Sequence, residues 1–194
     1  MSKTLTLFGF FGSLVLFGIS GFAQDFAAEV FSSQSGPDEV AKIFVSGDKV
    51  RIEPQRESES GGFVIWDVSG HHYLVVMPQR RMYMEFGGPM TQQQVLAFWR
   101  PADVNNACPD WERLAVQVKA QEKLGSCHKV GNDTVNGRAA VKYEGTSDDG
   151  KKGDVWVDAK IDFLVKMADA DGNVTQLRNI QEGSQPGSLF QVPP

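Results

Sequence analysis

The stretch from Val40 to Phe86 constrains the fold of this chain more than any other feature of its sequence. It contains short runs rich in β-branched and aromatic residues, and each break between runs carries Gly, Pro, Ser or paired charges. Such runs, separated by turn residues, are typical of consecutive antiparallel strands. The runs are Val40–Val45, Lys49–Glu53, Phe63–Val68, His72–Met77 and Met82–Phe86. The sequence therefore predicts an antiparallel β-meander.

The outer runs of this stretch alternate between apolar and polar residues, whereas the middle runs do not. Val50 and Ile52 interleave with charged neighbours, which predicts a sheet with one solvated face at that point. In 63–68 and 72–77, both sets of alternating positions are apolar. A sheet that is apolar on both faces must be covered on both faces or must curve around something. The functional question is therefore what this sheet covers or encloses.

The N-terminal residues have the pattern of a secretory signal peptide. One positive charge, Lys3, precedes an apolar region over residues 5–19, and the small residues Gly21 and Ala23 precede a cleavage site. A retained transmembrane anchor is the alternative, because the apolar run approaches the ~20 residues that a span needs. The glycines within the run and the terminal Gly-x-Ala favour cleavage.

We therefore expect a signal peptide at residues 1–23 and a single domain at residues 24–194, exported as a soluble periplasmic protein. The residue directly after the cleavage site is Gln24 and not a cysteine, which argues against a lipid-anchored form. Loss of Lys3 changes the net charge from −5 to −6. This charge disfavours nucleic acid or an anionic membrane surface as a partner unless a local patch overrides it. The one basic cluster worth naming is Arg80-Arg81, which a solvated hairpin turn explains.

The chain has two cysteines, Cys108 and Cys127. In an exported protein such a pair predicts a disulfide, which is worth about 3 kcal/mol for a loop of this size on the chain-entropy model. A metal site is the alternative, with His128 as the nearest further ligand, but nothing supplies a second Cys or His at ligand spacing. We therefore expect a disulfide and no metal.

Two short amphipathic helices are predicted after the meander. Thr91 is a good N-cap, and Val95, Phe98 and Trp99 share one helical face before Pro101 ends the helix. The second helix is predicted from Pro109, the favoured first helical position, to about Leu124.

Strands are predicted again after the second cysteine, and one more is predicted before the meander. These segments, in chain order, are 25–31, 128–131, 137–145, 154–158, 161–169 and 174–183. The tail after them is expected to pack Leu189 and Phe190 on the sheet. Because strands precede and follow the helices without βαβ alternation, we predict an α+β domain: one large curved antiparallel sheet with two short helices as a lid.

Catalytic and metal motifs are weak. His71 and His72 are strand neighbours that point to opposite faces, so they cannot chelate one ion together. The acidic segment 169–173 lacks the glycine and glutamate spacing of a calcium loop and is better interpreted as a hairpin turn. Neither a Gly-x-Ser-x-Gly elbow nor a phosphate loop is present. We therefore expect no enzymatic activity and no cofactor.

The chain is rich in tryptophan, methionine and phenylalanine. Ordinary core packing explains most of these residues. The functional alternative is a cavity between the curved sheet and the helices, lined by flexible methionines and rigid aromatic rings, that receives acyl chains. The candidate lining residues, chosen by strand and helix faces and subject to a one-residue register error, are Trp66, Tyr73, Val75, Met77, Met82, Met84, Phe98 and Trp99.

The order of several motifs along the chain resembles a known superfamily. The motifs are Gly47–Glu53, Asp67–Gly70, Tyr73–Pro78, Met82–Glu85, Val135–Arg138, Lys142–Glu144, Val155–Asp158 and Leu189–Pro193. With these, the sequence resembles the LolA-like superfamily of periplasmic outer-membrane lipoprotein carriers, and more narrowly the uncharacterised exported proteins of the DUF4412 family. The likeness covers essentially the whole chain after residue 23.

This resemblance implies an incomplete β-barrel of about eleven strands with a helical lid over a hydrophobic cavity. It implies a carrier or chaperone for a lipid or an acylated lipoprotein. The alternative is an envelope sensor or interaction module that binds a partner protein without transporting lipid. The carriers have an Arg-Pro dipeptide where this sequence has Ser46-Gly47, which puts lipoprotein transport in doubt, while Arg51 matches a downstream arginine of the carriers and is expected at the polar rim of the cavity.

Overall fold

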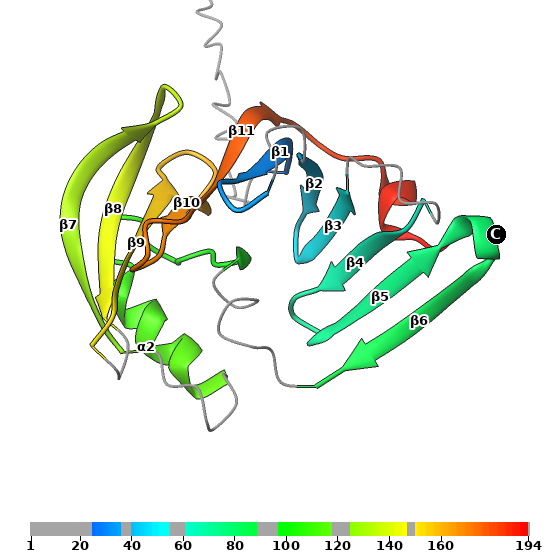
Figure 1. The fold of residues 1–194 in the computed structure, drawn as a ribbon, viewed down its shortest axis with the longest axis horizontal. Helices are drawn as coiled ribbons and strands as arrows, with labels where there is room; N and C mark the ends of the chain where they lie inside the picture. Colours follow the sequence, from blue (N-terminus) through cyan, green and yellow to red (C-terminus); the bar gives the residue numbers. More distant parts are fainter. Residues whose placement is uncertain are drawn as a thin grey trace, which may run out of the picture.

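Eleven strands in the described part of the chain form a single antiparallel sheet (Figure 1). The computed structural model describes residues 25–35, 40–54, 61–88, 97–117, 125–146 and 150–193. The order of strands across the sheet is β6-β5-β4-β3-β2-β1-β11-β10-β9-β8-β7. Within the described residues, the end strands β6 and β7 do not pair with each other, so the sheet is not closed.

Every strand that the sequence predicts is present, with ends that differ by a few residues. In the first half of the chain, the strands are β1 (Phe26–Ser32), β2 (Ala41–Ser46), β3 (Lys49–Pro54), β4 (Phe63–Asp67), β5 (His72–Met77) and β6 (Met82–Gly87). In the second half, they are β7 (Ser126–Val135), β8 (Arg138–Thr146), β9 (Lys152–Asp158), β10 (Phe163–Ala168) and β11 (Val174–Glu182). Two short 3-10 turns are η1 (Pro78–Arg80) and η2 (Gly187–Phe190).

Tight turns join neighbouring strands and fix their registers. The β7–β8 hairpin turns at Asn136 and Gly137, which both have positive φ, at +50° and +79°. This backbone is that of the two-residue hairpin turn that Asn-Gly favours. The one long-range pairing that unites the halves of the sheet is β1 with β11, in which Phe26 lies opposite Glu182.

The sheet bends into an arch (Figure 1). Directly opposite residues in an antiparallel pair point to the same face, so the registers Val45↔Val50 and Val50↔Trp66 place these three side chains together. We call the face that carries Trp66 the inner face, because residues 97–107 lie against it, and the opposite face the outer face. The main core lies on the inner face and extends from Phe26 to Tyr143 across most of the sheet.

Beneath one end of the arch lies α2 (Cys108–Gln117). The disulfide between Cys108 and Cys127 joins the start of this helix to the start of β7, with 5.4 Å between the Cα atoms. Trp111 of α2 donates a hydrogen bond from Nε1 to the carbonyl oxygen of Gly125, at 3.0 Å. Its ring also lies over Gly145, where a Cβ atom would come within 3.1 Å of the indole. The predicted disulfide is therefore confirmed, and it fastens the helix to β7 and β8.

The predicted α+β fold with a lid of two short helices is wrong. The only α-helix whose span lies within the described residues is α2, and the first predicted helix falls largely on residues 91–96, outside them. Residues 99–107 are not helical. The amide of Leu164 donates to the carbonyl oxygen of Trp99 at 3.2 Å. The molecule is dominated by its sheet, and α2 covers one end of it.

Candidate ligand-binding surface

Three aromatic rings stack across neighbouring strands at the β4–β6 end of the inner face. Trp66, Tyr73 and Phe86 lie directly opposite one another on β4, β5 and β6. The ring centroids of Trp66 and Tyr73 are 4.2 Å apart, and those of Tyr73 and Phe86 are 5.0 Å apart. The register of the meander therefore builds a continuous aromatic ladder that ends at the edge of the sheet.

A row of methionine and valine side chains runs beside this ladder. Val75 lies opposite Met84, and Met77 lies opposite Met82. Met82, Met84 and Phe86 are 42%, 43% and 41% exposed. We use the name inner apolar surface for the set Trp66, Tyr73, Val75, Met77, Met82, Met84 and Phe86. It contains all six strand residues that the sequence analysis names as candidate lining residues, so the predicted face has the correct register; their role in binding a ligand stays a prediction.

The structure separates the other two candidate residues. The ring of Phe98 packs on Trp66, with 5.3 Å between centroids, and so borders the inner apolar surface. Trp99 instead packs edge-on against Trp111 and Tyr143, on the far side of the arch. The two rings therefore do not share one packing surface: Phe98 contacts the β4–β6 end and Trp99 contacts the other half of the sheet, while Val95, the third residue of the predicted helical face, lies outside the described residues.

Tyr143 fastens the segment that carries these rings. Its hydroxyl donates to the carbonyl oxygen of Val104 at 2.6 Å and accepts from the amide of Ala107 at 3.2 Å. Burial raises the pKa of Tyr143 above its usual range. Sequence analysis does not identify this role, because the alternation of β8 marks Tyr143 only as a core residue.

Arg51 lies on the outer face, opposite Ile65, and not at the rim of the inner apolar surface, where the sequence analysis expects it. Its guanidinium lies over the ring of Phe63, 3.4 Å from the centroid, and its Nη1 donates to the carbonyl oxygen of Leu189 at 2.8 Å. It also pairs with Glu53. The alternation of β3 explains the difference, because Val50 and Ile52 take the inner face and Arg51 must take the other.

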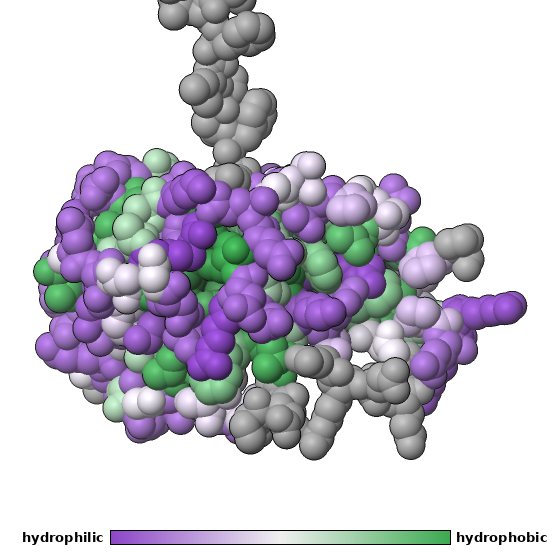
Figure 2. Space-filling model, turned by 90° about the horizontal axis from the view of Figure 1, so that it is seen from above, coloured by the Kyte–Doolittle hydropathy of each residue, from purple (hydrophilic) through white to green (hydrophobic). Residues whose placement is uncertain are grey.

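The C-terminal segment covers the outer face behind the inner apolar surface. Phe63, Ile65 and Val76 form a small separate core there, against which Phe190 and Val192 pack. The expected packing of Phe190 on the sheet is thus confirmed. The middle strands are apolar on both faces because this segment covers one of them, while the other carries the aromatic ladder. Over the rest of the outer side of the arch, seen in Figure 2, hydrophilic side chains dominate.

Charged groups surround the point where residues 97–107 cross the sheet. Burial lowers the pKa of Arg100, and the carboxylates of Asp48, Asp25 and Asp162 favour its charged form. Burial, with the nearby charge of Asp158, raises the pKa of Asp162. These charged groups lie near the turn ends of strands in the middle of the arch. None of them belongs to the inner apolar surface, whose one ionisable side chain is the phenol of Tyr73.

Groups that could perform acid–base or metal chemistry are not gathered on this surface. His128 lies 3.7 Å from Glu144, but this pair belongs to β7 and β8 at the other end of the sheet. Across the described ranges, no three His, Cys, Asp or Glu side chains are placed to hold a metal ion. None of the helices in the described part of the chain is long and apolar enough to cross a membrane.

The fold is similar to solved structures at low sequence identity. MucB matches with 15% identity over 89% of this chain and 58% of that chain, at a TM-score of 0.52. The MucA/MucB complex of Pseudomonas aeruginosa matches with 16% identity over 89% and 56%, at 0.50. An uncharacterised conserved protein from Thermus thermophilus matches with 11% identity over 88% and 86%, at 0.51. At these identities the likeness concerns the fold alone.

The matched proteins differ in how much of their own length this chain covers. The chain covers less than two thirds of MucB, and only 30% of PNGF-II, which it matches with 8% identity over 87% of its own length at a TM-score of 0.50. A putative outer membrane lipoprotein-sorting protein domain from Vibrio parahaemolyticus matches with 12% identity over 88% of this chain and 90% of that chain, at a TM-score of 0.37. No family model matches the sequence, and no curated protein does. The likeness to DUF4412 proteins therefore stays a prediction.

Proposed function

We propose that this protein is a non-enzymatic envelope protein that binds a lipid or an acyl chain on its inner apolar surface, as a carrier or chaperone. The observation that carries the proposal is the aromatic ladder of Trp66, Tyr73 and Phe86, flanked by methionines that are about two fifths exposed. Such side chains suit a ligand of variable shape, because the rings are rigid and methionine repacks easily.

The energetic argument is that of the hydrophobic effect. Complete burial of a methionine or phenylalanine side chain contributes about 1.5–3 kcal/mol. Met82, Met84 and Phe86 each retain about two fifths of that exposure, so a ligand that covers all three gains roughly 3 kcal/mol from them. The apolar area of the ligand itself adds to this gain, which favours a long hydrocarbon over a small polar molecule.

An exported location fits the disulfide. The Cys108–Cys127 bridge requires an oxidising compartment, such as the periplasm or the exterior of the cell. The signal peptide proposed at residues 1–23 would deliver the chain there. N-terminal mass analysis of the protein recovered from the envelope tests this step, because cleavage leaves a chain that begins at Gln24.

Ligand binding is tested with two single variants of adjacent residues. Met84→Glu places a charge on the inner apolar surface, whereas Tyr83→Glu places the same charge on the outer face of the same strand. Tyr83 is 55% exposed and Met84 is 43% exposed, so both changes should be tolerated by the fold. In a titration with a fluorescent fatty acid, we expect Met84→Glu to weaken binding at least about tenfold and Tyr83→Glu to leave it unchanged. Equal affinities of the two variants would contradict the proposed site.

Native extraction identifies the ligand itself. The protein is purified from its own envelope without detergent, and bound molecules are released in organic solvent for mass spectrometry. We expect a lipid or acyl species in near-equimolar amount from the wild type and much less from Met84→Glu. Wild-type protein that carries no such species would count against the proposal.

A second candidate function is the binding of a partner protein by an envelope sensor or interaction module. The observation that favours it is the fold likeness to MucB, which is solved in complex with MucA(peri). Pull-down from envelope extracts separates the two functions. A stoichiometric protein partner recovered equally by the wild type and by Met84→Glu, with no lipid present, would favour this second function.

A further inference from the structure

Exposed large apolar side chains gather on one edge strand. The structure describes five of them, and four lie on β6: Met82, Tyr83, Met84 and Phe86. The fifth, Val130, is 53% exposed on β7, at the opposite edge of the sheet. An exposed hydrophobic cluster of this kind usually marks an interaction site.

The apolar residues of β6 point to both faces of the sheet. Met82, Met84 and Phe86 belong to the inner apolar surface, whereas Tyr83 lies opposite Val76 on the outer face. All six residues of β6 are exposed, and among the described strands β5 alone pairs with it. A groove in a partner protein would cover one of these faces. An occupant that covers both must surround the edge of the strand.

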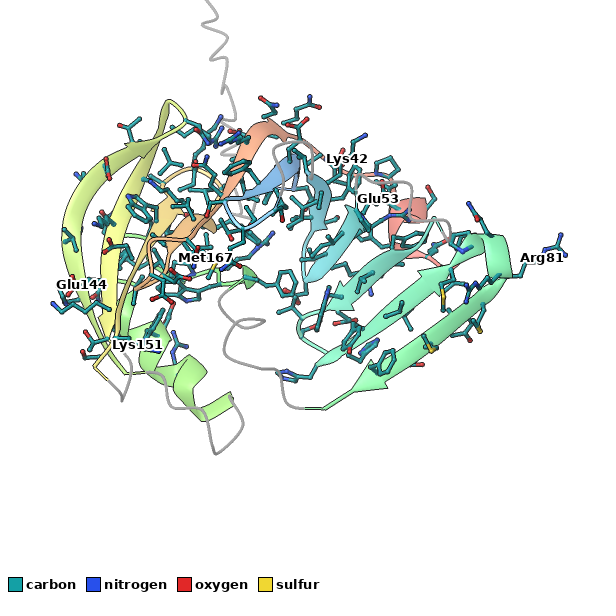
Figure 3. The ribbon with its side chains drawn as sticks, in the orientation of Figure 1. Lys42, Glu53, Arg81, Glu144, Lys151 and Met167 are labelled. Atoms are coloured by element: carbon teal, nitrogen blue, oxygen red, sulfur yellow. A yellow bond between two sulfur atoms is a disulfide. The ribbon has the colours of Figure 1, made fainter. Side chains whose placement is uncertain are left out.

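Two arginines lie at the end of the same hairpin. Arg80 closes η1 and Arg81 follows it in the turn before β6, and both are exposed. Figure 3 shows Arg81 projecting away from the molecule beyond the end of the hairpin. Within the described part of the chain, neither arginine forms an ion pair, and the one acidic residue of β6 is Glu85. The hairpin is therefore locally cationic on a protein of negative net charge.

We propose that the β5–β6 hairpin docks the protein on the surface of an anionic phospholipid bilayer. Arg80 and Arg81 would contact the headgroups, while Met82, Tyr83, Met84 and Phe86 would enter the interface. A bilayer surface accepts apolar side chains from both faces of a strand at once, and its negative charge complements the arginines. The free backbone edge of β6 needs polar partners, so it stays among headgroups and water and does not enter the hydrocarbon.

This inference goes beyond the proposed function, because it concerns attachment of the whole protein to a membrane and requires no ligand on the inner apolar surface. The docking surface and the inner apolar surface share Met82, Met84 and Phe86, but their other residues differ. Arg80, Arg81 and Tyr83 belong to the docking surface alone, and Trp66 belongs to the ligand surface alone. Variants of these residues therefore separate the two ideas.

Sedimentation with vesicles of phosphatidylglycerol and phosphatidylcholine, and with vesicles of phosphatidylcholine alone, tests the docking. Exported protein is used, with one N-terminus common to all variants. We expect wild type to sediment with the anionic vesicles, less so as salt rises, because headgroup attraction is screened. Each arginine near the surface contributes about 1 kcal/mol, so Arg80→Glu/Arg81→Glu should reduce partitioning at least about tenfold. Tyr83→Ser should reduce it several-fold.

Matched controls keep the result specific. Lys42→Glu/Lys129→Glu makes the same change in net charge at exposed sites away from the hairpin, and Val130→Ser removes an exposed apolar residue from the other edge strand. Both should bind the anionic vesicles like wild type. The arginine variant should bind the fluorescent fatty acid as wild type does, because Arg80 and Arg81 lie outside the inner apolar surface. If wild type binds no fatty acid, the proposed ligand function fails, while the vesicle comparison still tests the docking surface.

Two outcomes would overturn the docking surface. The first is unchanged vesicle binding by Arg80→Glu/Arg81→Glu, or binding equal to that of the lysine control. The second is a wild-type dimer in light scattering that Tyr83→Ser dissociates and that does not sediment with either kind of vesicle, because the occupant of β6 would then be a second copy of the chain.

Discussion

At one end of the sheet Tyr143 is 1% exposed beneath α2 and residues 97–107, whereas at the other end Met84, on the same inner face, is 43% exposed. The β7–β10 end is covered by α2 and residues 97–107, which are held there by the disulfide and by the two hydrogen bonds that the phenol of Tyr143 makes, one as donor and one as acceptor. The β4–β6 end has an equally apolar inner face and lacks such a cover in the described residues. The difference teaches that one sheet can bury its inner face at one end and, among the described residues, leave that face partly exposed at the other; the exposed end is the one that we propose binds a ligand.

Removal of the disulfide should have the largest effect on the covered end. Cys108→Ser/Cys127→Ser frees the start of α2 from β7, and the chain-entropy model predicts a loss of about 3 kcal/mol in the free energy of unfolding. Urea denaturation measures this loss, while fatty-acid titration of the folded protein should show unchanged affinity. A variant of undiminished stability would mean that the bridge does not hold the cover in place.

Tyr143→Phe should have the next largest effect. It leaves the carbonyl oxygen of Val104 and the amide of Ala107 without their partner in a buried place, at a cost of about 1–3 kcal/mol. Tyr83→Phe, at an exposed position of the open end, is the matched control and should change stability by less than ~0.5 kcal/mol. Equal losses from the two variants would remove the contrast between the ends.

A pH-dependent contribution is expected from Glu182. Hydrogen bonds from Lys160 and then Arg138 hold the pKa of Glu182 below its usual range. A lowered folded-state pKa stabilises the protein above the usual pKa of glutamate, and this stability is lost as the pH falls through the folded-state value. Glu182→Gln should therefore lower stability near neutral pH, by less than ~1 kcal/mol for a pair near the surface, and should flatten the acid limb of the stability profile. Parallel acid limbs for the two proteins would contradict this assignment.

The smallest effect on stability is expected at the open end. Met84→Ser removes a side chain that is 43% exposed, so the unfolding free energy of the variant should stay within ~0.5 kcal/mol of wild type. Val157→Ala, at a fully buried position of β9, should cost at least ~1 kcal/mol. If Met84→Ser destabilised the protein as much as Val157→Ala, the inner apolar surface would be ordinary core.

Local patterns in the sequence predict the strands and one face of the site. Alternation in 82–86 places Met82, Met84 and Phe86 on one face, since a period-two pattern depends only on neighbouring residues. The same pattern, through Val50 and Ile52, assigns Arg51 to the outer face, but the resemblance to the carriers overrides it and leads to the wrong location.

Long-range contacts account for the rest. The two-helix lid is wrong because residues 99–107 are not helical, although the apolar spacing around Phe98 and Trp99 fits a helix. Hydrogen bonds to Leu164 and Tyr143, which are distant in sequence, hold the backbone of this segment on the sheet. The sequence shows an apolar tail that contains Phe190, but it does not show that this tail packs against Phe63 and Val76 on the outer face. Such contacts decide which end of the inner face is buried and which is exposed in the described residues, and no local sequence pattern predicts this difference.

The most direct test of the open end is methionine methyl NMR with a spin-labelled fatty acid. Met77, Met82 and Met84 lie on the inner apolar surface, whereas Met167 lies on β10 near the centre of the arch and serves as an internal reference (Figure 3). We predict that the methyl signals of the first three broaden much more strongly than that of Met167 when the ligand is added. Broadening centred on Met167, or no broadening of the β5–β6 methionines at saturating ligand, would contradict the claim that the open end of the sheet is the binding surface.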